Sequence, residues 1–255
     1  PVLLERPGVG ENLQDHLQLR CAYKVSGIRT LNERAGRLMG KMAIALEYAI
    51  SRSGAMSMAP SQLGMFTRSD ASYETPNLEY HVHPLTLEKF GEPLHAFPAF
   101  TASVCNLRPD SRGSVHAASP DFRKQPAIRP NYLSTETDRQ VAADAIRLTR
   151  RIVTQEPLKP YRPEEFKPGP AFQTEEELVQ ATGLIGTTIF HPVGTCQMGA
   201  DQESVVDPAL KVRGVSRLRI ADASVMPTIT SGNTNSPTLM IAEKAADLIL
   251  TDARR

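Results

Sequence analysis

The chain has few aromatic residues, few cysteines and almost no net charge. Only 5% of its 255 residues are aromatic, and none is tryptophan. Its 29 basic and 28 acidic side chains leave a formal charge of +1, which gives no electrostatic basis for binding nucleic acid. Its 3 cysteines form no C-x-x-C pair, so we expect neither a disulfide framework nor a zinc ribbon, and a reducing, cytoplasmic location fits best.

Two further absences narrow the possible classes of protein. The longest apolar stretches, such as residues 42–50, are interrupted by Glu47 and are shorter than the ~20 residues of a membrane span. We therefore expect no integral membrane protein, while peripheral association with a membrane stays open. No G-x-G-x-x-G or G-x-x-x-x-G-K-[ST] motif occurs, and the first residues include neither an initiator Met nor a signal peptide. We expect a piece of a longer protein, with any nucleotide cofactor held largely elsewhere.

The middle of the chain predicts an antiparallel sheet with helices. Short segments rich in aromatic or β-branched residues, bounded by Pro, Gly and Asp, lie at 78–83, 97–106, 114–118 and 127–128. Helical spacing predicts a helix over 135–153 with Asp138 as N-cap, and a capping box starts another helix at Thr174. A further helix is predicted over 31–51, and its apolar face is formed by Leu38, Met42, Ala45, Leu46 and Ala49.

The C-terminal segment predicts a strand, a long polar loop and a helix. The strand covers residues 218–222, and the helix runs from Pro237 to Leu250 with Ser236 as N-cap. The backbone N–H groups of the first helical turn would stabilise an anion beside the Asn-rich loop. The simpler alternative is that Asn and Gly only build the turn. The predicted apolar side of the helix consists of Leu239, Ala242, Ala246 and Ile249.

One histidine is a candidate for proton transfer. His191 stands between an aromatic residue and a proline, and small residues follow it that let the backbone approach a flat ligand. Because the unperturbed pKa of imidazole is near neutrality, His191 could act as a general base for a hydroxyl proton. A hydrogen-bonded loop histidine without catalytic work is the open alternative.

Other reactive side chains favour structural roles. His81 and His83 share one face of a predicted strand, but no third ligand is evident, so we expect no metal site. Asp15 and His16 indicate a structural polar cluster near the Gly8–Gly10 turn. Cys196 has no lysine or second thiol nearby in the sequence, so packing is favoured over nucleophilic catalysis.

Five motifs in order resemble the glucose-methanol-choline (GMC) oxidoreductases, in particular their choline or alcohol dehydrogenase-like branch. They occupy residues 7–16, 108–115, 130–133, 191–199 and 222–247. The resemblance covers the C-terminal half of that family; the N-terminal Rossmann part that binds the ADP moiety of FAD is absent. This implies an α+β fold, a mostly antiparallel sheet with helices on one face, joined to C-terminal segments of an FAD-binding domain.

The resemblance also implies roles for individual residues. His191 matches the histidine that takes the hydroxyl proton of an alcohol while hydride leaves for flavin N5, and Asn233 matches its partner, which holds the substrate oxygen. Asp222 and Ala223 match the segment at the flavin ribityl and pyrophosphate. The stretch at the pyrimidine edge of the isoalloxazine is matched by Asn235, Pro237 and Thr238.

The resemblance further implies a division of the chain and a function. Residues 1–16 would end the FAD-binding domain, 17–185 would form the substrate-binding domain, and 186–255 would carry the catalytic loop and the closing strand and helix. We expect the substrate-binding and catalytic half of an FAD-dependent alcohol dehydrogenase whose partners are a small alcohol, the missing N-terminal half and an electron acceptor. Self-association is also expected. A non-catalytic remnant or interaction subunit without FAD, and a redox-silent lyase, stay open.

Overall fold

The computed structural model describes residues 4–59, 61–89 and 91–254. Two compact units make up the chain: residues 1–17, 107–139 and 188–255 form the first, and residues 18–106 and 140–187 form the second. Residues 107–139 thus group with the two ends of the chain, whereas the sequence-based division placed them within 17–185. The functional division itself stays a prediction.

The second unit contains a six-stranded sheet. The strands are β1 (Leu17–Lys24), β2 (Leu63–Thr67), β3 (Leu78–His83), β4 (Ala99–Asn106), β7 (Glu164–Lys167) and β8 (Gly186–Thr188). Their order is β2-β3-β4-β1-β7, with β8 also paired to β1, and the pairs between β2, β3, β4, β1 and β7 are antiparallel. This confirms the α+β class. Strands β1, β2, β7 and β8 were not predicted.

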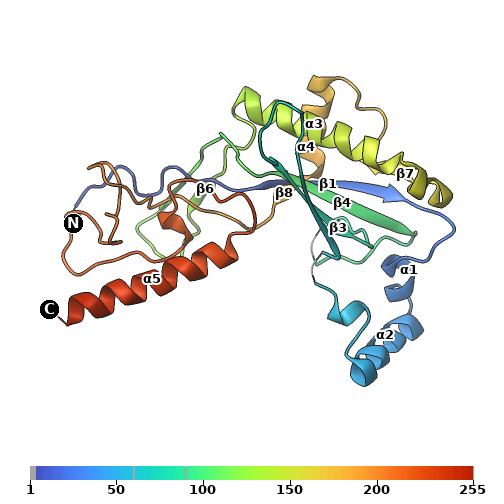
Figure 1. Cartoon of the computed structure of the whole chain (residues 1–255), viewed down its shortest axis with the longest axis horizontal. Helices are drawn as coiled ribbons and strands as arrows, with labels where there is room; N and C mark the ends of the chain where they lie inside the picture. The colour runs from blue at the N-terminus through green and yellow to red at the C-terminus, as the bar shows by residue number, and fades with distance from the viewer. Residues whose placement is uncertain (1–3, 60, 90, 255) are drawn as a thin grey trace. The chain divides into compact units, whose positions relative to one another are not determined.

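Helices α3 (Glu136–Val153) and α4 (Glu175–Ile185) cover one face of this sheet (Figure 1). Alternation along the strands places Leu19 and Val104 on the covered face, where both are buried. The Tyr80 hydroxyl lies 2.9 Å from Thr149 Oγ1 on α3, which joins helix and sheet within the core.

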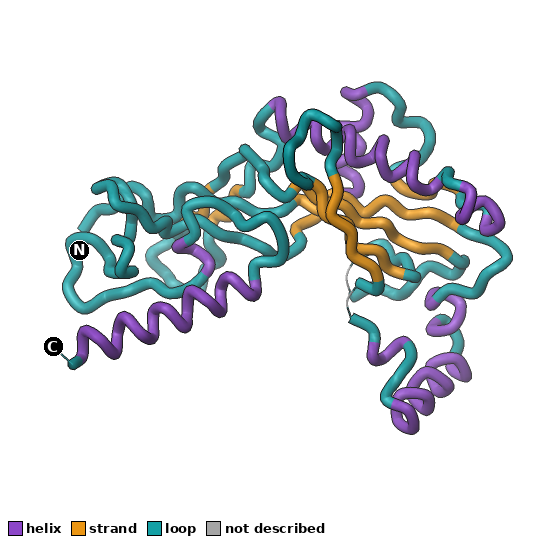
Figure 2. Tube along the Cα trace, in the orientation of Figure 1, coloured by secondary structure: helices purple, strands orange, loops and turns teal. Residues whose placement is uncertain are grey.

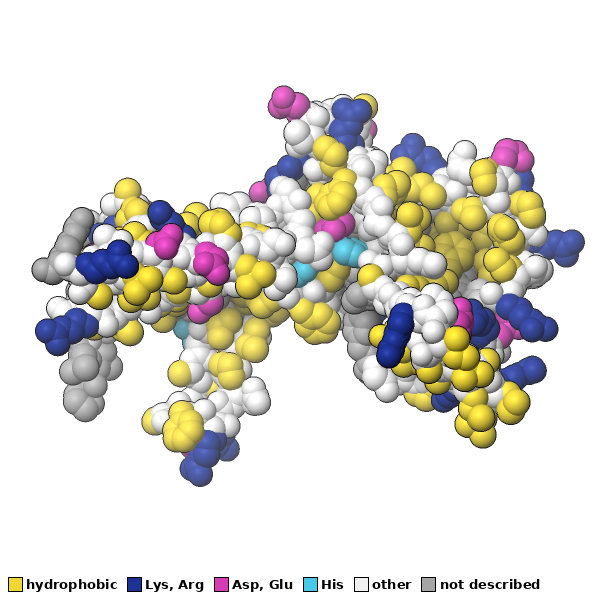
Figure 3. Space-filling model, turned by 60° about the horizontal axis from the view of Figure 1, so that its bottom comes forward, with side chains coloured by type: hydrophobic (Ala, Val, Ile, Leu, Met, Phe, Trp, Pro, Cys, Tyr) yellow, Lys and Arg dark blue, Asp and Glu magenta, His cyan; other side chains and the backbone are white. Residues whose placement is uncertain are grey.

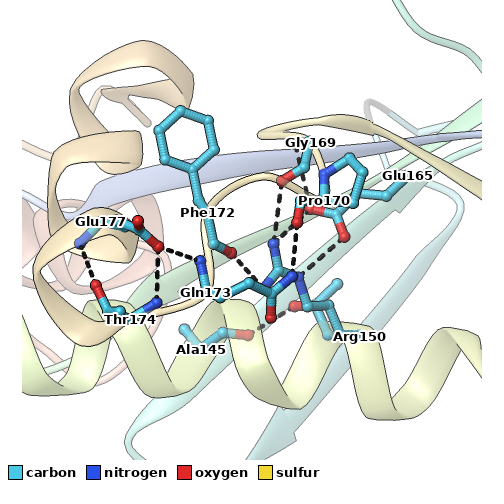
Figure 4. Close-up of polar contacts among 10 residues, drawn as sticks. Ala145, Arg150, Glu165, Gly169, Pro170, Phe172, Gln173, Thr174 and Glu177 are labelled. Atoms are coloured by element: carbon cyan, nitrogen blue, oxygen red, sulfur yellow. Dashed lines mark hydrogen bonds and ion pairs between the residues drawn. The ribbon is translucent and has the colours of Figure 1, made fainter.

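A half-buried arginine links α3 to the segment that leads into α4 (Figure 4). Arg150 donates two hydrogen bonds of 2.9 Å to the carboxylate of Glu165 on β7, and a third to the carbonyl of Phe172. The predicted capping box is confirmed: the Thr174 hydroxyl accepts from the backbone of Glu177, and the Glu177 carboxylate accepts from the backbone of Thr174.

The first unit is built mostly from loops (Figure 2). Its regular elements are β5 (Ser114–His116), β6 (Ala127–Arg129), the 3-10 turn η3 (Ala223–Val225) and α5 (Asn235–Ala253). A valine-rich cluster forms its core and consists of Val193, Val205, Val206, Leu210, Val225, Met226, Ile229, Ile241 and Ala245. Since little regular secondary structure connects these loops, this cluster and the side-chain hydrogen bonds described below hold them in place.

Two helix predictions need correction. The predicted helix over 31–51 is two helices, α1 (Leu31–Ala35) and α2 (Leu38–Ser51), because the chain leaves helical geometry at Arg37. Asp138 lies inside α3, and Thr135 Oγ1 accepts the hydrogen bond of an N-cap instead. The Asp138 carboxylate accepts from the backbone N–H groups of Asp110 and Ser111.

The C-terminal prediction also needs correction. Residues 218–222 form no strand, only an isolated bridge between Arg219 and Lys211. Helix α5 begins at Asn235 after Thr234, one residue before the predicted Ser236 cap. Its predicted apolar side is exposed, and the neighbouring side with Ile241 and Ala245 packs into the valine-rich cluster, because periodicity alone does not identify which apolar side meets the core.

No helix in the described ranges combines the length and the apolarity that a membrane span requires.

Candidate functional site

Three segments of the first unit converge around His191. Residues 12–16 run antiparallel to residues 188–195: the backbone N–H of Gln14 donates to the Val193 carbonyl at 3.0 Å, and the reverse bond is 2.9 Å. The third segment, 227–235, leads from η3 into α5. These polar segments therefore share backbone hydrogen bonds as strands do, although neither has the apolar pattern of a strand.

Glycine is required at two close approaches of the backbone in this unit. Gly194 has φ +93°, and a Cβ there would lie 2.4 Å from the Asn12 carbonyl oxygen. Gly10 has φ +87°, and a Cβ there would lie 2.1 Å from the Val115 carbonyl oxygen. Side chains are excluded at both positions by sterics and by backbone conformation.

Two amides position the third segment. Asn12 Nδ2 donates to Gln197 Oε1 at 2.8 Å and to the Pro227 carbonyl at 3.2 Å. Gln14 is almost fully buried, and its Oε1 accepts from the backbone N–H of Ile229 at 3.1 Å. The bonds to Pro227 and Ile229 each span 215 positions of the sequence and hold the loop before Asn233.

Asp15 holds the backbone of the candidate base. Its Oδ1 accepts from the N–H of His191 at 2.9 Å, and its Oδ2 accepts from the hydroxyls of Tyr132 and Thr188. Burial raises the pKa of Tyr132, and the hydrogen bond to Asp15 raises it further, so this phenol stays a neutral donor. The carboxylate therefore accepts three hydrogen bonds beside His191, which is itself buried.

The hydrogen bonds of His16 define the tautomer of His191. His16 Nε2 lies 3.0 Å from the carbonyl oxygen of Leu107, which can only accept, so this nitrogen carries a proton. In neutral His16, Nδ1 then accepts, and it lies 3.0 Å from His191 Nδ1. His191 must donate from Nδ1, which leaves the lone pair of its neutral form on Nε2.

The Asn233 side chain lies beside His191 Nε2. Its Nδ2 lies 3.4 Å from His191 Nε2, and its residue is exposed. The structure thus brings the two predicted catalytic residues together from positions 42 apart in the chain. A base nitrogen beside an amide donor can take a proton from a hydroxyl group while the amide holds the oxygen.

The residues predicted to hold FAD lie at the two ends of the third segment. Asp222 is exposed and caps η3 by accepting from the Ser224 N–H at 2.8 Å, and Ala223 follows it half-buried. Asn235 is the exposed first residue of α5, and Pro237 and Thr238 are half-buried in its first turn.

The first turn of α5 suits a group that accepts hydrogen bonds. Thr234 makes no side-chain cap, so no side chain from that position occupies the first N–H groups of the helix. In the loop just before, Thr230 Oγ1 is buried without a hydrogen-bond partner in the described part of the chain. An unsatisfied hydroxyl and uncapped N–H groups fit the polar edge of a flavin ring.

Asp15 and His16 are functional candidates that sequence reasoning assigned to a structural cluster. The sequence signal was present, because an Asp-His pair stood in a polar segment too poor in apolar residues for a core element. His16 and His191 are 175 positions apart in the sequence. No local sequence pattern could therefore predict that they are in contact.

The remaining candidates lie elsewhere. His81 Nδ1 is 3.3 Å from Ser61 Oγ, and its Nε2 is 3.3 Å from Glu79 Oε1. No group of three or more His, Cys, Asp or Glu side chains is placed to hold a metal among the residues that the structure describes. Burial raises the pKa of the Cys196 thiol, so it is a poor nucleophile at neutral pH.

Comparison with known proteins gives the family. Residues 109–242, slightly more than half of the chain, match the family model described as GMC oxidoreductase. The oxygen-dependent choline dehydrogenase of Pseudomonas syringae pv. tomato is 40% identical over 249 residues, covering 98% of this chain and 44% of that protein. The enzyme of the same name from Citrobacter koseri is 41% identical with the same coverage. The chain thus spans less than half the length of these relatives.

Solved structures share the fold. Pyridoxine 4-oxidase from Mesorbium loti matches with a TM-score of 0.76 and 27% identity, over 96% of this chain and 44% of that one. A variant of the formate oxidase of Aspergillus oryzae, studied for FAD modification, matches with a TM-score of 0.89 and 26% identity, over 98% and 48% of the two chains. The chain therefore belongs to the GMC oxidoreductases, and it corresponds to the C-terminal, substrate-domain part of their choline dehydrogenase-like members.

Proposed function

We propose that this chain is the substrate-binding and catalytic half of an FAD-dependent alcohol dehydrogenase. The observation that supports this most directly is the hydrogen-bonded series from the Leu107 carbonyl through His16 to His191. It fixes the neutral imidazole in the tautomer that presents Nε2 as a base. A loop histidine with a purely structural role does not require one particular tautomer. The hydrogen bond with the second buried histidine, His16, therefore supports a role of His191 as a base.

In this proposal His191 Nε2 accepts the hydroxyl proton of an alcohol, and the protonated ring keeps its Nδ1–H bond to His16. The Asp15 carboxylate, bonded to the His191 backbone, favours the positive charge that forms. The Asn233 amide donates to the substrate oxygen and orients the carbinol carbon.

Bound FAD would supply a hydride acceptor for the carbinol carbon, so that the alcohol would become an aldehyde or ketone. On this chain the groups that would hold it are Asp222 and Ala223, the hydroxyl of Thr230, and the first turn of α5 with Asn235, Pro237 and Thr238. The relatives carry more than half of their length outside the matched region, and we propose that this remaining part holds most of the cofactor.

We propose an alcohol as the substrate and do not specify which one. The relatives are named for choline, whose quaternary ammonium is usually bound by aromatic faces. This chain contains no tryptophan and 5% aromatic residues, so its composition gives no support for a quaternary ammonium as the substrate. We also propose that the protein is located in the cytoplasm and that an electron acceptor is a further partner.

A chimera tests the proposal. The N-terminal part of the P. syringae choline dehydrogenase is fused to residues 1–255, and the purified flavoprotein is mixed without oxygen with a panel of primary and secondary alcohols. We expect at least one alcohol to bleach the flavin absorbance, and His191→Ala in the same chimera to remain yellow. If flavin is bound but no alcohol bleaches it, the chain would instead belong to a redox-silent lyase. If the chimera folds without flavin, the chain would be a non-catalytic remnant or interaction subunit.

A further inference from the structure

We propose that a hollow in the second unit binds a small aliphatic carboxylate, and that Arg20 recognises the carboxylate group. This inference concerns residues of the second unit alone and does not depend on the proposed alcohol chemistry. Its basis is an excess of positive charge around the hollow, the partial burial of Arg20 and a buried hydroxyl without a partner across the sheet from it.

The hollow has a volume of about 420 Å³ and lies against strands β1 and β4. Alternation along these strands places Arg20, Ala22 and Thr101 on the face of the sheet opposite to α3, and all three line the hollow. The loop after β3, the end of α4, β7 and β8 supply the rest of the lining. Since ligand pockets range over ~300–1,000 Å³, a hollow of this volume suits a small molecule.

The lining carries more positive than negative charge. Among its described residues three are cationic, Arg20, Lys89 and Lys167, and one is acidic, Glu88, so two positive charges are in excess. The Glu88 carboxylate accepts a hydrogen bond of 2.5 Å from Lys167 Nζ. This bond holds the pKa of Glu88 below its ordinary value, so Glu88 stays charged and neutralises Lys167. The excess charge therefore lies on the other two cations.

Arg20 is set apart by its partial burial. Surface cations alone do not mark a binding site, because Lys and Arg side chains are scattered over the surface in Figure 3. Arg20 is half-buried, and its Nη2 lies 3.5 Å from the carbonyl oxygen of Leu87, which lines the same hollow. Burial lowers the pKa of Arg20, and the nearby charge of Glu88 raises it to a smaller extent. An anion that reaches this guanidinium would stabilise its charge, and the forked N–H donors match the two oxygens of a carboxylate.

A buried hydroxyl stands across the sheet from Arg20. Ser103 of β4 is directly opposite Arg20 in the antiparallel pair of β1 and β4, so the two side chains project from the same face. Ser103 is 1% exposed, and its Oγ has no hydrogen-bond partner within the described part of the chain. A ligand that accepts from this hydroxyl would satisfy it. A carboxylate at Arg20 is such an acceptor.

The rest of the lining favours a carboxylate over inorganic phosphate. Apolar residues, among them Ala22 and Leu87, contribute to the hollow and suit a short carbon chain. Lys89 is exposed and Lys167 is already paired with a carboxylate, so Arg20 supplies the one half-buried positive charge in excess among the described lining residues. One such charge matches a monoanion. We therefore assign the hollow to an aliphatic carboxylate.

Titration calorimetry on the flavoprotein chimera tests the assignment. The probes are acetate, butyrate and hexanoate, with butyramide as a neutral counterpart and inorganic phosphate as a different anion. We expect saturable binding of at least one carboxylate, no binding of butyramide and weaker binding of phosphate. Arg20→Gln should weaken carboxylate binding at least ~10-fold, because it removes a charge-assisted pair of hydrogen bonds. Lys89→Glu should weaken it about 3-fold, and Lys124→Glu, at an exposed lysine of the first unit, should leave it unchanged.

A second measurement identifies the source of the carboxylate. The chimera is reduced without oxygen by 4-hydroxybutyrate or by 1-butanol. If the carboxylate belongs to the alcohol substrate, 4-hydroxybutyrate has the lower half-saturating concentration, and Arg20→Gln removes the difference. If it belongs to a separate ligand, butyrate binds without competing with the alcohol. Binding is read by calorimetry, so it stays measurable even if no alcohol reduces the flavin.

Circular dichroism verifies that each variant is folded, and Lys89→Glu, at an exposed residue, keeps the test decisive if Arg20→Gln unfolds. Three results would overturn the assignment. The first is that none of the carboxylates binds saturably. The second is that butyramide or phosphate binds as tightly as butyrate. The third is that the variants at Arg20 and Lys89 bind carboxylate as tightly as Lys124→Glu does.

Discussion

The Nδ1 atoms of His16 and His191 lie 3.0 Å apart, with the two rings edge to face at 83°. Because His16 donates from Nε2 to a backbone carbonyl, it accepts from His191, and the orientation of the candidate base depends on it. His16 is thus a positioning residue in the proposed mechanism.

Replacing His191 by alanine should lower alcohol-dependent flavin reduction in the chimera by roughly 10²-fold or more, because it removes the proton acceptor. Stopped-flow absorbance measures this step directly. Flavin content should stay unchanged, since the residues proposed to hold FAD are others. A reduction rate equal to that of the parent would exclude His191 as the base.

Asn233→Ala should slow the same step less than the histidine change. It removes a hydrogen-bond donor worth roughly 1–3 kcal/mol and leaves proton transfer intact. Asn233→His should retain activity, because a protonated ring nitrogen can donate to the same oxygen. If the main effect of Asn233→Ala were loss of flavin, the loop would serve the fold and not the substrate.

His16→Phe should lower the flavin reduction rate while flavin binding persists, because His191 Nδ1 loses its acceptor and the ring its fixed tautomer. We expect a loss worth about 1–3 kcal/mol in the rate constant, with a smaller change in the alcohol concentration at half-saturation. His16→Gln keeps an acceptor and a donor and should recover part of the rate. His116→Ala, on an exposed side chain, is the control. Equal rates for His16→Phe and His116→Ala would contradict a positioning role.

Stability should fall as the solution becomes alkaline. Burial raises the pKa of the Cys21 thiol to about 12 and raises the pKa values of Tyr23 and Tyr80 above the usual range. Raised pKa values stabilise the fold below the pKa of the unfolded chain, and this contribution is lost as pH rises from there toward the folded values. Each group contributes a slope of at most ~1.4 kcal/mol per pH unit. Urea unfolding from pH 7 to about pH 11 measures the loss, and a flat profile would contradict these pKa shifts.

One of these tyrosines offers a stabilising substitution. The Tyr23 hydroxyl is buried and has no hydrogen-bond partner in the described part of the chain. Tyr23→Phe should raise the free energy of unfolding at pH 7 by about 1 kcal/mol and reduce its alkaline loss. Tyr161→Phe, at a residue 36% exposed, should change neither. A destabilised Tyr23→Phe variant would show that the hydroxyl has a partner.

The 255-residue chain alone should bind FAD weakly and self-associate. The adenylate would normally lie on a G-x-G-x-x-G turn that this chain does not contain, and α5 exposes Leu239, Met240 and Leu250. Light scattering after gel filtration measures the mass, and Leu239→Glu with Ile249→Glu should shift it toward the monomer. A monodisperse monomer with micromolar FAD affinity would contradict this prediction.

The sequence by itself determined the features that depend on local pattern. The strands Leu78–His83 and Ala99–Asn106, helix α3 and the Thr174 capping box all follow from periodicity, propensity and one short-range hydrogen-bond pattern. The resemblance of five motifs to the GMC oxidoreductases was likewise a property of the sequence, and the family match agrees with it.

The tertiary structure alone decided which apolar side of a helix is buried and which distant polar groups meet. Helices α2 and α5 each have apolar residues on more than one side, and only packing shows that Ile44 and Ile241 turn inward while Leu46 and Leu239 do not. His16 lies next to His191 because backbone hydrogen bonds join residues 14 and 193 and because the two segments approach closely at Gly194. Contacts across such separations depend on the whole folded chain, so no local pattern encodes them.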